Sequence, residues 1–192
     1  PDRGTAYASF EESGITRTAA ISSSSVGDLL RKRFYEEEGR PPNAQALQDV
    51  RDVLRAQARF EGEEQRVNLR IAQRNGSIFV DLCDDDWNAV AITPTGWTTK
   101  RAEEMPVKFR RTQGMQSLPE PEQGGGLELL RRHLPIADED SFALLLAYLV
   151  QSLRPSGPYP ILCLTGEQGA GKTTAARMIR SLVDPSHVPV RT

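Results

Sequence analysis

The feature that most constrains the fold is the segment formed by residues 159–183. It begins with a continuous apolar run of strand length, YPILCLT, passes through the glycine-rich stretch GEQGAGKT at 166–173, and ends in a helix-period pattern that Asp184-Pro185 stops. A nearly unbroken apolar run predicts a strand covered on both faces, as in a parallel α/β sheet. The order strand, glycine-rich loop, helix is the context that a phosphate-binding loop requires.

Residues 166–173 match the Walker A pattern G-x-x-x-x-G-K-[ST]. Glycines in such a loop let successive backbone N–H groups face one anion, and the start of the following helix adds its positive dipole end. The lysine ammonium reaches the β- and γ-phosphates, while the threonine hydroxyl ligates Mg²⁺. We therefore predict Lys172 as the catalytic residue and Thr173 as the metal ligand. The predicted ligands of ATP are Gly166, Glu167, Gln168, Gly169, Ala170, Gly171, Lys172, Thr173 and Thr174.

ATP hydrolysis requires groups that this motif does not supply. A P-loop ATPase needs an acid on a second strand to complete the magnesium site and orient water, and usually an arginine that stabilises charge on the γ-phosphate. Asp184 follows the loop helix directly, so the sequence predicts a helix-end or turn residue there. We expect residues 1–192 alone to bind ATP without turning it over, and the full-length protein to hydrolyse ATP.

Three parts of the chain differ in sequence pattern. Residues 1–110 predict an α+β domain, residues 111–126 a linker with prolines and glycines but no periodicity, and residues 127–192 the N-terminal part of a P-loop NTPase domain. The predicted fold class is α/β overall, in which an α+β domain with an antiparallel meander precedes the beginning of an α/β domain. An alternative function for residues 1–110 is that of a separate module that binds nucleic acid or protein.

Local patterns predict the individual elements. From residue 66 the apolar period changes from helical to two, with Val67, Leu69 and Ile71 alternating with polar residues, and Asn75-Gly76 is a strong hairpin turn. Asn43 is suited to cap a helix. The expected elements are a hairpin over residues 5–21 that turns at Glu12-Ser13-Gly14, helices over 26–38 and 43–60, a four-stranded meander over 66–100, and helices over 127–133, 142–153 and 173–183.

Composition excludes several protein classes. The chain has 24 Lys+Arg against 26 Asp+Glu, a net charge of −2, so any nucleic-acid surface must be local. Cys83 and Cys163 lack the spacing of a zinc site or redox motif and indicate a reducing compartment, hence a cytoplasmic location. The apolar run 142–150 is half of the roughly 18 residues that a membrane span needs. We expect no membrane association.

The remaining charged clusters and the two histidines are interpreted as structural rather than functional. The aspartates within residues 81–86 are interpreted as a solvated turn rather than a divalent-cation site, and the arginines within 51–59 as a solvated helix face. The basic residues around Phe109 are interpreted as ordinary surface, with nucleic-acid contact as the alternative. His133 and His187 are isolated, and no nucleophilic or metal role is predicted for them.

The chain also resembles a known family. The similarity covers most of residues 5–190 and is carried by residues 34–47, 67–93, 96–100, 106–121 and 158–185. These segments resemble bacterial P-loop ATPases of prophages and integrative elements, described as primase-helicase or phage-type ATP-binding proteins. The resemblance implies an ATP-driven motor that acts on DNA during replication of a mobile element, with DNA as partner and, if helicase-like, a homo-oligomeric ring. A small-molecule P-loop kinase is the alternative function.

Overall fold

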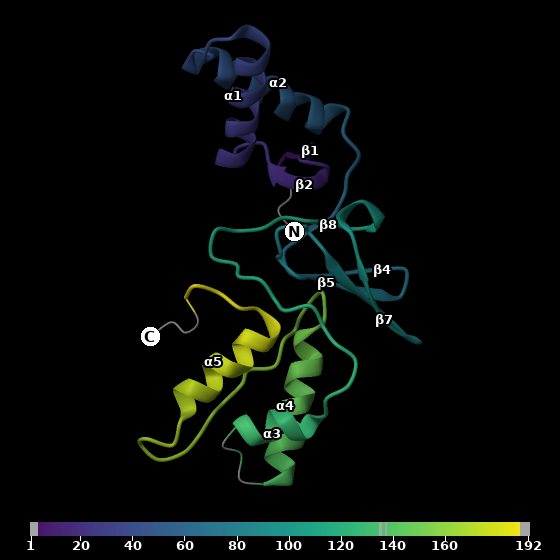
Figure 1. The fold of residues 1–192 in the computed structure, drawn as a ribbon, viewed down its shortest axis with the longest axis vertical. Helices are drawn as coiled ribbons and strands as arrows, with labels where there is room; N and C mark the ends of the chain where they lie inside the picture. Colours follow the sequence, from purple (N-terminus) through teal and green to yellow (C-terminus); the bar gives the residue numbers. More distant parts are fainter. Residues whose placement is uncertain (1–3, 135, 137, 189–192) are drawn as a thin grey trace.

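The computed structural model describes residues 4–134, 136 and 138–188, which form a mixed α/β fold with antiparallel sheets (Figure 1). The parallel sheet expected around the Walker A loop is not formed by these residues. In chain order the elements are β1 (Tyr7–Glu12), β2 (Ile15–Ala20), α1 (Ser24–Glu38), α2 (Ala44–Phe60), β3 (Val67–Asn68), β4 (Ile71–Arg74), β5 (Ser77–Asp81), β6 (Ala89–Thr93), β7 (Gly96–Lys100), a 3-10 turn (Ala102–Glu104), β8 (Lys108–Phe109), α3 (Leu127–His133), α4 (Glu139–Ser152) and α5 (Lys172–Val183).

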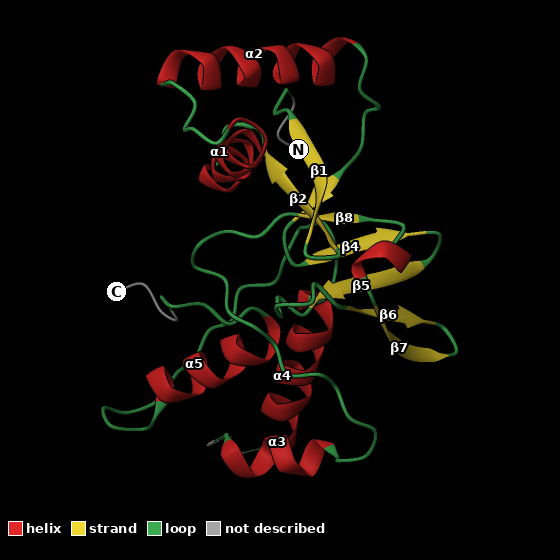
Figure 2. Ribbon diagram, turned by 45° about the horizontal axis from the view of Figure 1, so that its top comes forward, coloured by secondary structure: helices red, strands yellow, loops and turns green. Residues whose placement is uncertain are grey.

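The predicted N-terminal hairpin and both following helices are confirmed. Strands β1 and β2 pair antiparallel across the predicted turn. Helix α1 begins after Ser23, whose hydroxyl accepts from the Val26 N–H at 3.3 Å, and ends at Gly39. Helix α2 begins after Asn43, whose side-chain oxygen accepts from the Ala46 N–H at 2.7 Å. Figure 2 shows both helices on the hairpin side of the molecule, away from α4 and α5.

One arginine of α2 departs from the predicted solvated face. Arg51 is half-buried, and its Nη2 donates to the Ser23 carbonyl at 2.8 Å, which ties α2 to the start of α1. Arg55 instead pairs with Asp52 on the helix surface at 2.8 Å. The prediction of a solvated stripe is therefore wrong for Arg51, because the close approach of two helices left one guanidinium between them.

The four-stranded meander is confirmed, in the order β4-β5-β6-β7. Asn75 and Gly76 both have positive φ, of 51° and 77°, as the tight turn between β4 and β5 requires. The position predicted for the first strand of the meander is wrong. Residues 67–68 form β3, which lies outside the meander and pairs parallel with β8. Between β3 and β4 the burial is also the opposite of what the alternating pattern predicts: Leu69 is 45% exposed and Arg70 only 5%. The polar residue of the alternating pattern is the buried one.

Two apolar clusters lie on the sheet and a third lies among the C-terminal helices. The sheet clusters form around Phe79 and around Val80. The helical cluster joins α4 to α5 through Phe142, Leu145, Ala175 and Ile179. Helices α3, α4 and α5 confirm the three helices that the sequence predicts after residue 126. None of the described helices is long and apolar enough to cross a bilayer.

The apolar run at residues 159–165 does not form the predicted strand. It has no strand partner within the described part of the chain, and its side chains alternate, with Leu162 and Leu164 packed against the α4–α5 cluster while Ile161 and Cys163 face outward. A strand needs a neighbour to satisfy its backbone N–H and C=O groups. Without one, the apolar run alone does not produce a strand.

Residues 114–118 of the predicted linker lie between the sheet and the end of α5. The Leu118 N–H donates to the Leu82 carbonyl at 2.8 Å, and the Gln116 N–H donates to the Pro185 carbonyl at 3.0 Å. An antiparallel bridge joins Met115 to Ser186. This segment therefore contacts both halves of the molecule, the sheet half (residues 4–110) and the helical half (residues 127–188), through backbone hydrogen bonds.

Candidate phosphate-binding site

The Walker A residues form the turn that leads into α5. Gly169 and Gly171 have φ of 85° and 77°, in the left-handed region that glycine adopts without strain. Gly171 is the N-cap of α5, and no side chain caps this helix end. The first N–H groups of a helix have no intrahelical acceptor. The N–H groups that open α5 are therefore available to an anion.

Lys172 folds back over this loop. Its ammonium donates to the Gly166 carbonyl at 2.8 Å and to the Glu167 carbonyl at 2.7 Å, and it has no carboxylate partner among the described residues. The Glu167 carbonyl also accepts from the Ala170 N–H at 3.3 Å. A positive charge held only by neutral carbonyls, beside an uncapped helix start, favours an anion at this position.

The other predicted ligands lie in the same loop. Gln168, Gly169, Ala170, Thr173 and Thr174 are exposed, so phosphate oxygens can reach them. No group of three or more acidic, histidine or cysteine side chains within the described residues is placed to hold a metal. The roles of Thr173 as Mg²⁺ ligand and of Lys172 as catalytic residue remain predictions.

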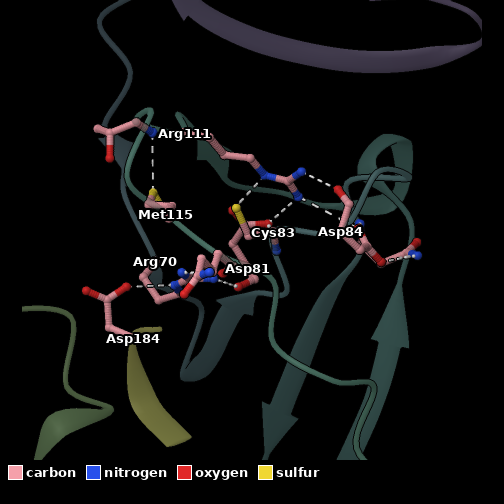
Figure 3. A network of polar contacts seen from close by, with 10 residues as sticks. Arg70, Asp81, Cys83, Asp84, Arg111, Met115 and Asp184 are labelled. Atoms are coloured by element: carbon pink, nitrogen blue, oxygen red, sulfur yellow. Dashed lines mark hydrogen bonds and ion pairs between the residues drawn. The ribbon is translucent and has the colours of Figure 1, made fainter. Parts of the chain in front are cut away.

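A polar network that sequence reasoning missed lies within the sheet half, centred on Asp81 (Figure 3). Asp81 is fully buried and accepts from Arg111 through both carboxylate oxygens, at 2.7 and 3.0 Å, and from the Cys83 N–H at 3.1 Å. The Arg111 guanidinium also lies 4.1 Å from the centroid of the Trp87 ring and donates to the Asp84 carbonyl. Burial raises the pKa of the Cys83 thiol, so this group stays protonated at neutral pH.

Two interpretations of surface clusters are corrected by this network. Asp81 is not part of a solvated turn, because its two bonds from Arg111 compensate its burial. Phe109 is buried in the sheet core, and Arg111 is turned inward, so residues 108–111 are not an open basic patch. The signal that could have revealed the pair is weak, since the two residues are thirty positions apart in sequence.

Arg70 links the sheet to the end of the loop helix. Its Nε donates to the Asp184 carboxylate at 3.0 Å, and its Nη1 donates to the Asp81 carbonyl at 3.1 Å. Its Nη2 donates to the carbonyls of Gln116, at 2.9 Å, and Pro185, at 3.4 Å. Asp184 is the helix-end residue that the sequence predicts, and it also anchors α5 to the sheet.

Comparison with known protein families gives a match in the C-terminal part of the chain. Residues 127–191 match the family model for the actinomycete integrative conjugative element replication protein. No curated protein and no solved structure gives a significant match. The matched region contains α3, α4, the Walker A loop and α5, and it does not reach the sheet half. The match supports a replication protein of a mobile element.

Proposed function

We propose that this chain carries the Mg²⁺–ATP site of a DNA-dependent ATPase that takes part in replicating a mobile element. The observation that carries the proposal is the uncapped start of α5, beside which the Lys172 ammonium is held only by loop carbonyls. The family match supports the replication role, and the matched residues 127–191 include this loop.

Different groups of the loop would bind different parts of Mg²⁺–ATP. Backbone N–H groups of the loop and of the first turn of α5 donate to phosphate oxygens, and the Lys172 ammonium exchanges its carbonyl partners for phosphate. The Thr173 hydroxyl is the side-chain oxygen of the loop that Mg²⁺ would take as ligand. When bound, ATP supplies the phosphoanhydride bond whose hydrolysis drives work on DNA.

Titration of the chain with a fluorescent ATP analogue and Mg²⁺ tests the nucleotide site. We expect Lys172→Ala to weaken binding by about tenfold or more, because a charge-assisted contact to phosphate is lost. Lys32→Ala is the matched control, since Lys32 is an exposed helical lysine on α1. Equal affinity of the two variants would show that the loop is not a nucleotide site.

The dependence on DNA requires a separate measurement. Phosphate release from ATP is followed in the full-length protein, with and without single-stranded DNA, and we expect DNA to stimulate it. Absence of stimulation counts against the motor even if the nucleotide binds. Light scattering with and without nucleotide tests the homo-oligomeric ring that the resemblance implies.

A further inference from the structure

We propose that a cavity beside residues 177–181 of α5 binds a phosphate of the DNA backbone. The cavity has a volume of about 460 Å³, and its polar lining comes from Gln116, Arg177, Arg180, Ser181, Ser186 and His187. This inference rests on the DNA partner of the proposed function and assigns a place where that partner is held.

The cavity is positively charged. Arg177 is exposed and has no hydrogen-bond or ion-pair partner in the described part of the chain. The Arg180 Nε donates to the Asp184 carbonyl at 3.4 Å, and none of the described residues that line the cavity is acidic. The Arg177 guanidinium, beside hydroxyl and amide groups of the lining, suits a phosphodiester, because guanidinium geometry matches phosphate oxygens.

The wall of the cavity is fixed by Arg70. The carbonyls of Gln116 and Pro185, two lining residues, both accept from the Arg70 Nη2. The Gln116 N–H donates to the Pro185 carbonyl at 3.0 Å, and the Gln116 side chain lies 3.4 Å from the His187 Nδ1. A wall held in place before the ligand arrives loses less entropy on binding.

Nearby negative charge is neutralised in the same arrangement. Asp184 precedes the lining residue Pro185 in sequence but does not itself line the cavity. Its carboxylate accepts from the buried Arg70 (Figure 3). Without Arg70, this carboxylate would lie close to an anionic ligand and repel it. Arg70 therefore holds the wall and removes an opposing charge.

The position of the cavity separates it from the nucleotide site. Arg177 follows Lys172 by five residues, which corresponds to roughly 7.5 Å along a helix axis. The N–H donors lie at the start of α5, whereas the cavity is lined by residues 177–181 of α5 together with Gln116 and residues 185–187. One helix would thus hold nucleotide phosphates at its start and a DNA phosphate beside its middle turns.

Fluorescence anisotropy with a labelled single-stranded DNA oligonucleotide tests the proposal over a range of salt concentrations. We expect Arg177→Ala to weaken binding by about fivefold and to reduce the slope of log affinity against log salt by about 0.7, the value for one lost phosphate contact on a single strand. Arg33→Ala, an exposed arginine on α1 without a described partner, is the matched control and should change neither quantity. Circular dichroism checks that both variants are folded.

The outcomes separate the cavity from the nucleotide site. If Arg177→Ala and Arg33→Ala bind DNA equally, or if the unmodified chain binds no DNA, the cavity proposal is wrong, while ATP binding stands or falls with Lys172→Ala. Inorganic phosphate provides a further arm. If Arg177→Ala weakens phosphate binding but leaves DNA binding unchanged, the cavity serves a free anion and DNA is overturned as its ligand.

Discussion

Of two apolar segments of strand length, β5 forms a paired strand and residues 159–165 do not. β5 pairs antiparallel with β4 on one side and β6 on the other, and it buries Phe79 and Val80. Residues 159–165 have no strand partner within the described residues, and Ile161 is 94% exposed. The two sequences are similarly apolar, so hydrophobicity does not account for the difference.

The difference lies in where the partner strands come from. The neighbours of β5 are joined to it by short connections, and an antiparallel pair can form across a two-residue turn. A parallel partner needs a crossover connection of a dozen or more residues. The meander is therefore complete within a short stretch of chain, whereas a parallel partner for residues 159–165 would have to come from a distant part of a chain.

The largest expected effect compares a buried residue of β5 with the exposed residue of the unpaired run. Phe79→Ala should destabilise the fold by about 3–5 kcal/mol, because it leaves a cavity in the sheet core. Ile161→Ala should change the free energy of unfolding by less than about 0.5 kcal/mol, as expected of a surface substitution. Urea denaturation of both variants measures the difference.

A large loss of stability in Ile161→Ala would break this comparison. It would mean that Ile161 is buried in solution, by a strand partner or by another copy of the chain. Repeating the measurement at several protein concentrations distinguishes these two cases, because only association depends on concentration.

A smaller effect is expected where the two halves meet. Arg70→Ala removes four hydrogen bonds to Asp81, Gln116, Asp184 and Pro185 and should cost about 2–3 kcal/mol. Asp184→Ala should cost less, about 1–2 kcal/mol, because the buried guanidinium loses its counter-charge but keeps three carbonyl acceptors. Hydrogen exchange should rise at residues 114–118 and 184–188 in Arg70→Ala and much less in Asp184→Ala. Equal exchange in both variants would show that the carboxylate alone carries the link.

Most helices and the meander could be predicted because their causes are local. Asn43 caps α2, Gly39 ends α1, and Asn75-Gly76 turns β4 into β5, each through backbone groups a few residues away. The absence of the predicted strand at residues 159–165 could not be foreseen, because an apolar pattern indicates a segment that can be buried and not the presence of a partner strand.

The candidate phosphate-binding loop could be proposed from the sequence for the same reason, because residues 166–173 are contiguous, and its binding of ATP stays a prediction. The Arg70 and Arg111 networks could not be proposed, since they join residues 11 to 115 positions apart. Arg70 stands in an alternating run whose phase predicts an outward side chain. Burial became favourable because Asp184 and three carbonyls surround its guanidinium, and only the tertiary structure brings these groups together.

The smallest effect concerns the helix caps of the two halves, Asn43 for α2 and Asp138 for α4. The Asn43 oxygen accepts from the Ala46 N–H at 2.7 Å, and the Asp138 carboxylate accepts from the Ser141 N–H and hydroxyl, both at 2.8 Å. These bonds lower the pKa of Asp138 below its ordinary value of 3.8. Its stabilisation of α4 is therefore fully present above pH 3.8 and is lost as the pH falls through the lowered folded pKa.

NMR titration of the two cap amides checks this difference. The Ser141 amide shift should follow a transition below pH 3.8, and the Ala46 amide should show none while the fold persists, because the Asn43 amide does not titrate. Arg131 likewise lowers the pKa of Glu139, so Glu139→Gln serves as control for that neighbour. Asp138→Asn keeps a cap acceptor and should abolish the Ser141 transition. Persistence of the transition in Asp138→Asn would assign it to another carboxylate and leave the two caps equivalent.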